Sequence, residues 1–90
     1  MNKQRRKQIS EVVSRVESVQ AELESLLDDI QGIMDEETEY RDNIPENMQG
    51  GDRYEMADHA CSELEAAHET LDNAKDSLEE VVSSLESAAE

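Results

Sequence analysis

TEYRDNIPENMQGGDRYE, residues 38–55, interrupts a chain that otherwise consists of acidic residues and regularly spaced aliphatic ones. It holds the only proline, two of the three glycines and both tyrosines of the 90 residues. Pro45 lacks an amide hydrogen and disfavours a helical residue before it, so a helix cannot continue through this stretch. Gly50 and Gly51 permit a sharp reversal after a short helical turn over Pro45–Met48. The stretch therefore predicts a loop that reverses the chain.

Helical patterns with a seven-residue period flank this loop on both sides. The first pattern has aliphatic residues at heptad positions a (Ile9, Val16, Leu23, Ile30), d (Val12, Val19, Leu26, Ile33, with Tyr40) and e (Val13, Leu27, Met34). The second has Ala57, Leu64, Leu71, Leu78 and Leu85 at a, and Ala60, Ala67, Ala74, Val81 and Ala88 at d. We expect the two a/d stripes to pack together, with bulky residues of the first helix opposite alanines of the second.

The fold expected from these patterns is all-α: an antiparallel, coiled-coil-like hairpin of two helices. It forms a single domain over residues 1–90, with a basic arm at 1–8, a helix at 9–41, a loop at 42–52 and a helix at 53–88. Asp52 is expected to cap the second helix, with Glu55 completing a capping box. Position e of the second helix would remain partly wet (Cys61, His68, Lys75, Val82). A homodimer that forms a four-helix bundle would cover these flanks.

The charge of the chain restricts its partners. There are 24 acidic and 8 basic residues, a formal net charge of −16, and five of the basic residues lie within residues 1–15. Phosphates would be repelled by such a surface, so we expect no direct binding of nucleic acid. No apolar run is long enough for a membrane span, and no apolar segment follows the basic start as in a secretory signal. The single Cys61 fits a reducing, cytoplasmic compartment.

Catalysis is not expected, because a two-helix hairpin offers no enclosed pocket in which pKa values could be shifted. Cys61 and His68 lie about 10 Å apart along one helix and cannot act as a nucleophile and its base. Glu65 and His68 have the Glu-x-x-His spacing of di-iron bundles, but they lie away from the a/d seam. The sequence therefore predicts a protein that is not an enzyme and that uses no cofactor or metal.

Two surfaces are candidates for binding a partner. One is an acidic face, represented by Glu22, Asp29, Glu36 and Glu63. About 20 carboxylates on helices about 50 Å long give one charge per about 2.5 Å, against one per about 1.7 Å in duplex DNA, so this face could occupy the basic groove of a nucleic-acid enzyme. The other candidate is the loop end, with Tyr40, Arg41, Asn43, Asn47, Arg53 and Tyr54.

Other interpretations of both surfaces remain open. An acidic helical hairpin can serve as an assembly or scaffold coiled coil. At the loop, tyrosine stacking and arginine–phosphate pairing could hold a nucleotide. Alternatively, Tyr40 closes the seam, Tyr54 packs beneath the loop, and Arg41 and Arg53 pair with nearby acids.

The loop resembles that of small, acidic, uncharacterised proteins encoded by bacteriophages and prophages. Such proteins place a Tyr-x-Asp-Asn-Ile-Pro-Glu-Asn-x-Gln loop between two charged helices. The matching residues are Tyr40, Asp42, Asn43, Ile44, Pro45, Glu46, Asn47 and Gln49, and the similarity covers about residues 35–75. The resemblance implies a phage protein that acts inside a bacterial host. By analogy, it suggests a DNA mimic that inhibits a host defence protein, of anti-restriction or anti-CRISPR type.

Overall fold

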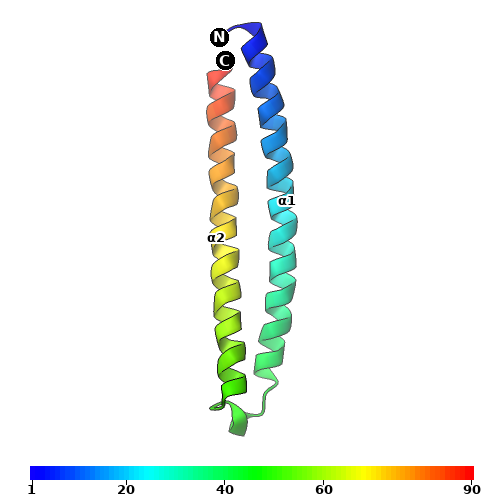
Figure 1. Cartoon of the computed structure of the whole chain (residues 1–90), viewed down its shortest axis with the longest axis vertical. Coiled ribbons are helices and arrows are strands. Elements are labelled where there is room, and N and C mark those ends of the chain that lie inside the picture. Colours follow the sequence, from blue (N-terminus) through cyan, green and yellow to red (C-terminus); the bar gives the residue numbers. More distant parts are fainter.

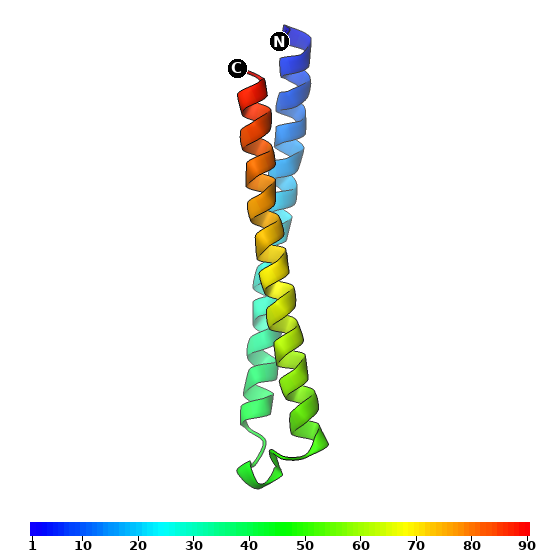
Figure 2. The same ribbon diagram turned by 90° about the vertical axis from the view of Figure 1, so that its left-hand side faces the viewer.

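Two long helices and a short loop make up the whole chain. The computed structural model describes residues 1–90 and contains α1 (Lys3–Asp42), the 3₁₀ turn η1 (Glu46–Met48) and α2 (Asp52–Ala88). The helices run antiparallel and side by side, so that both termini lie at one end and the loop at the other (Figure 1). Turned by 90°, they cross at a shallow angle in a rod measuring 69 × 15 × 13 Å (Figure 2). The predicted all-α hairpin is confirmed.

The helix boundaries differ from the predicted ones mainly at the N-terminus. α1 begins at Lys3 and not at Ile9, so most of the predicted basic arm is helical. The reason is a cap: the side chain of Asn2 accepts a hydrogen bond from the backbone N–H of Arg5, at 2.8 Å. α2 begins at Asp52, with Gly51 as the N-cap, so Asp52 is not the capping residue. Its carboxylate and that of Glu55 lie in the first turn, where they favour the helix dipole.

The loop is closed by Ile44, whose side chain is only 3% exposed. α1 ends where the sequence predicts, because the residue before Pro45 is disfavoured in a helix. The carbonyl of Ile44 accepts a hydrogen bond from Gln49 Nε2 at 3.3 Å, and the backbone N–H of Met48 donates to the carbonyl of Pro45 at 2.8 Å. Neither Gly50 nor Gly51 has a positive φ, so the reversal uses ordinary backbone conformations. The reversal lies at the predicted place, but it does not use the positive φ that glycine permits.

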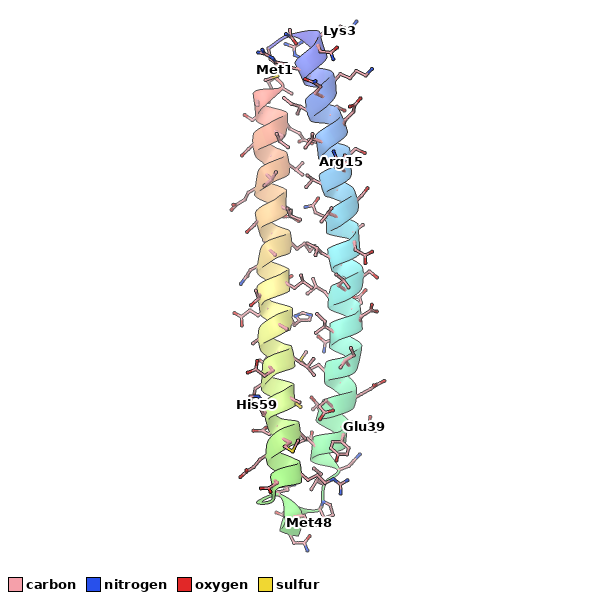
Figure 3. All side chains as sticks on the ribbon, viewed as in Figure 1. Met1, Lys3, Arg15, Glu39, Met48 and His59 are labelled. Carbon is pink, nitrogen blue, oxygen red and sulfur yellow. The ribbon has the colours of Figure 1, made fainter.

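The seam between the helices uses heptad positions a and e, and not the predicted a and d. Position e is buried where position d is exposed: Val13 and Leu27 are 8% and 7% exposed, whereas their neighbours Val12 and Leu26 are 42% and 39% exposed. Cys61, at position e of α2, is also buried. The side chains that fill the space between the two ribbons are visible in Figure 3, with Met48 at the loop end and Lys3 at the other.

The physical reason for this choice is side-chain size. Position d of α2 is mostly alanine, which removes little apolar area from water when it is buried, at about 0.8 kcal/mol per methylene. Position e of α2 offers larger groups, such as His68, Lys75 and Val82, whereas α1 has large side chains at both d and e. Packing through e therefore places the larger side chains of α2, and not its alanines, in the seam. The expectation that a partner covers the e positions is wrong, since these positions already lie in the seam.

The d positions form a surface of their own, which we call the apolar face. In an antiparallel pair that packs through a and e, the d positions of both helices lie on the same side of the seam. The apolar face consists of Val12, Val19, Leu26, Ile33 and Tyr40 on α1 and Ala60, Ala67, Ala74, Val81 and Ala88 on α2. Its large residues on α1 are 39–53% exposed.

Ile44→Ala should destabilise the hairpin by about 2–4 kcal/mol, as expected for an aliphatic side chain removed from a core, although the residue lies in a loop. Met48→Ala is the matched control, because Met48 lies in the same loop and is 50% exposed. It should change the free energy of unfolding by less than about 0.5 kcal/mol. Urea unfolding followed by circular dichroism measures both. Equal effects would mean that Ile44 does not anchor the loop.

Gly50→Ala should stabilise the protein by about 0.4–1 kcal/mol, because it restricts the unfolded chain without straining the folded one. A Cβ added at Gly50 meets nothing within 4 Å, and the φ of this residue is not positive. Thermal unfolding provides the measurement. A loss of stability would show that Gly50 adopts a left-handed conformation in solution.

Candidate functional site

Tyr40 and Arg53 form a stacked pair at the loop end of the apolar face. Arg53 Nε donates a hydrogen bond to the Tyr40 hydroxyl at 2.6 Å, and its guanidinium carbon lies 5.2 Å from the ring centroid. Both residues occupy position d, so their contact places the d stripes of α1 and α2 on the same side of the hairpin. Tyr40 does not close the seam, since it is 43% exposed. The pair instead ends the apolar face.

Arg41 lies on the opposite side of the hairpin from Arg53. Its Nη1 lies 2.9 Å from Asp58 Oδ1 on α2, and its Nε lies 3.1 Å from Asp42 Oδ1. Hydrogen bonds to Asp42 and Asp58 raise the pKa of Arg41 above its usual value. Arg41 thus pairs with nearby acids, as one of the sequence interpretations predicts.

The loop residues predicted as a binding site do not converge. Asn43 and Asn47 are exposed near the tip, whereas Tyr54 is half-buried. A shallow depression of about 360 Å³ includes Asn47 and Arg53 but neither Tyr40 nor Arg41. The two arginines are engaged with protein groups on different sides. The loop therefore does not present both arginines and both tyrosines to one ligand.

The predicted acidic residues line the edges of the apolar face. Glu22, Asp29 and Glu36 are exposed and follow one another at seven-residue spacing, about 10 Å apart along α1. Glu63 occupies the corresponding heptad position on α2. We call these four residues the acidic edge. Their carboxylates flank apolar side chains and do not form a separate face.

A second set of carboxylates, which the sequence analysis did not select, lies on the polar side of the hairpin. We call it the acidic column; it is exposed, occupies position b of α2 and consists of Asp58, Glu65, Asp72, Glu79 and Glu86. Only Asp58 takes part in an ion pair, with Arg41. The signal that could have identified the column is the seven-residue recurrence of acids along α2. These acids lie together on one side of the hairpin because the seam uses position e, which is next to position b on the helix surface.

Lys75 and Glu24 connect the two helices on the polar side. Lys75 Nζ lies 3.1 Å from Glu24 Oε1, and this hydrogen bond, which outweighs partial desolvation, raises the pKa of Lys75. The pair also defines the register. From Glu24 to Thr38 is fourteen residues forward on α1, and from Lys75 to Cys61, whose Sγ lies 3.6 Å from Thr38 Oγ1, is fourteen back on α2.

Residues with metal-binding or catalytic potential are dispersed. Cys61 is buried in the seam, His68 is half-buried, and Glu65 belongs to the exposed acidic column. No group of three or more His, Cys, Asp or Glu side chains is placed to hold a metal ion. Neither helix contains the long apolar run needed to cross a membrane.

Comparison of the chain with protein-family models, with curated proteins and with solved structures finds no match.

Lys75→Met should remove a pH-dependent part of the stability. Because the pKa of Lys75 is raised in the folded chain, its stabilising effect is fully present below the ordinary lysine pKa and is lost as the pH rises through the raised value. The difference in free energy of unfolding between the parent protein and the variant should thus be larger at about pH 8 than at about pH 11. Glu24→Gln should reproduce this behaviour. A difference that does not change with pH would contradict the Lys75–Glu24 pairing.

Proposed function

We propose that the protein is a non-enzymatic acidic binding protein that contacts a basic surface of a partner protein through its acidic column. The observation that carries the proposal is the column itself. Glu65, Asp72, Glu79 and Glu86 are exposed, take part in no ion pair and recur every seven residues along one side of α2. Carboxylates at intervals of about 10 Å present several negative charges along one line, which attracts the arginines and lysines of a nucleic-acid-binding groove.

The arrangement of the basic residues supports this side as the contact surface. Arg41 and Lys75 form their ion pairs with Asp58 and Glu24, so the other four acids of the column take part in no ion pair. Charges of one sign along a rod steer a partner of opposite charge and accelerate association. Such binding weakens as salt screens the charges.

The resemblance of the loop to phage and prophage proteins supports a setting for this activity. In that setting the protein acts in the cytoplasm of a bacterial host. Its partner is a host enzyme with a basic groove, such as a restriction or CRISPR effector, and the column takes the place of the nucleic acid. The partner class follows from charge: a groove built to hold phosphates also attracts spaced carboxylates.

An assembly role is the second candidate, and the exposed apolar face favours it. A nucleotide-binding loop has less support, because Arg53 is engaged by Tyr40 and Arg41 by Asp42 and Asp58. The apolar face and the acidic column lie on opposite sides of the hairpin. One surface can therefore bind a partner while the other is covered.

Two variants with equal net charge test the acidic column. The column variant combines Glu65→Gln, Asp72→Asn, Glu79→Gln and Glu86→Gln. The control changes the acidic edge by Glu22→Gln, Asp29→Asn, Glu36→Gln and Glu63→Gln. Each variant is immobilised and exposed to bacterial lysate, and the retained proteins are eluted with increasing salt or with added DNA or RNA. Only the column variant should lose, on the order of tenfold or more, the retention of a protein that nucleic acid displaces.

Two results would contradict the proposal. Equal loss in both variants would mean that net charge, and not the column, determines binding. Retention of proteins that neither moderate salt nor nucleic acid releases from the parent protein would exclude mimicry of nucleic acid and favour the assembly role.

A further inference from the structure

The proposed role of the acidic column does not account for the exposed apolar face. Five large side chains at seven-residue spacing on α1 are 39–53% exposed on a rod in which only five residues are buried. Contiguous apolar surface of this kind marks a contact with another molecule. We propose that a second copy of the chain covers this face, with the two-fold axis parallel to the helices, so that both loops lie at the same end of a four-helix bundle.

The sizes of the side chains on the face support a second copy. The register set by Glu24–Lys75 and Thr38–Cys61 brings each large residue of α1 to within one residue of the level of a d residue on α2. At four of the five levels that residue is alanine, and at the fifth Val19 meets Val81. One half of the face is therefore raised and the other half is hollow. Such a face is complementary to itself.

The two-fold axis follows from this division. Rotation about an axis parallel to the helices keeps every residue at its level and places α1 of one copy over α2 of the other. Large side chains then meet alanines: Leu26 meets Ala74 of the second copy, and Ile33 meets Ala67. Rotation about a perpendicular axis would place large side chains on large ones and alanines on alanines. Close packing of unlike sizes favours the parallel axis.

The hollow half of the face has room for these side chains. A groove of about 550 Å³ runs along α2, lined in part by Ala67, Thr70 and Ala74, with Ile30 of α1 as part of its wall. Leu26 and Ile33 of the second copy enter this groove. Their burial removes from water the side chains that the hairpin leaves exposed.

Polar residues at the edges agree with the same axis. On α1 the edge carries Glu22 and Asp29, whereas the matching positions of α2 carry Ser77 and Thr70. With the axis parallel to the helices, these carboxylates meet hydroxyl groups of the second copy. With the perpendicular axis they approach each other, and like charges placed opposite one another are unfavourable. One like-charged pair remains, Glu36 with Glu63.

The area of the face is sufficient for a specific dimer. From Val12 to Tyr40 it extends about 42 Å at about 1.5 Å per residue. The rod is 15 Å wide, which gives about 600 Å² on each copy. The total of about 1,200 Å² reaches the range of specific interfaces. This pairing does not depend on the function of the acidic column, which lies on the other side.

Leu26→Glu combined with Ile33→Glu tests the pairing. The control is Ser14→Glu with Ser25→Glu, which adds the same charge at exposed positions outside the apolar face. Sedimentation equilibrium over a range of concentrations measures mass, and circular dichroism measures helix content. The parent protein and the control should be dimers. The apolar-face variant should remain helical, with a dissociation constant raised at least 100-fold.

Salt gives a second, independent readout. Each copy carries a formal net charge of −16, so the two copies repel each other. Raising the salt concentration screens this repulsion and should strengthen the dimer, whereas it should weaken the binding of a basic partner to the acidic column. A failure of the pairing is therefore distinguishable from a failure of the proposed function.

The orientation is tested with a spin label on Met48→Cys in a Cys61→Ala background, which leaves one reactive thiol. Loops at the same end place the two labels roughly 20–30 Å apart, given helix spacings of about 8–10 Å. Loops at opposite ends place them nearly the 69 Å length of the rod apart. The long distance would overturn the proposed axis. A parent protein that stays monomeric at high concentration and high salt, or an apolar-face variant that stays a dimer, would overturn the pairing.

Discussion

The packing of heptad positions a and e across the seam determines the other surfaces of this protein. Because Val13, Leu27 and Cys61 turn inward, the d positions are left on one side and the b positions on the other. The first side becomes apolar and the second acidic. Arg41 and Lys75, at position e, reach acids at position b, so both interhelical ion pairs lie on the polar side. One rotation of the helices thus produces two unlike surfaces.

The hairpin could be predicted from the sequence because its signals are strong and local. Pro45 stops the first helix, and the seven-residue period defines both helices. The choice between a/d and a/e could not be made in the same way, since d and e both lie beside a on a helix. α1 offers aliphatic residues at both, with Leu26 at d and Leu27 at e. The residues of α2 decide between a/d and a/e packing, because the alanines at position d of α2 bury less area than its e residues do.

The same limitation explains which candidate residues were found and which were not. Glu22, Asp29 and Glu36 were selected as an acidic face, but their surroundings depend on the seam, and they border the apolar face. The acidic column required knowledge of which side of α2 is polar. At the loop, residue types indicated Tyr40 and Arg53, and their contact at 2.6 Å is a tertiary one that spacing alone does not reveal. The chemical type of each residue could be read from the sequence, whereas the side of the hairpin on which it lies could not.

Pairing of two hairpins would also change what the acidic side can imitate. A single chain carries a formal net charge of −16 over 69 Å, or one charge per about 4 Å, which is sparser than the one per about 1.7 Å of duplex DNA. Two copies with both loops at one end occupy the same length and carry twice the charge, one per about 2 Å, while their acidic columns face outward on opposite sides. The bundle as a whole thus approaches the charge density of the duplex. Pairing through the apolar face would thus raise the charge density of the whole rod, while each acidic column keeps its own spacing of about 10 Å.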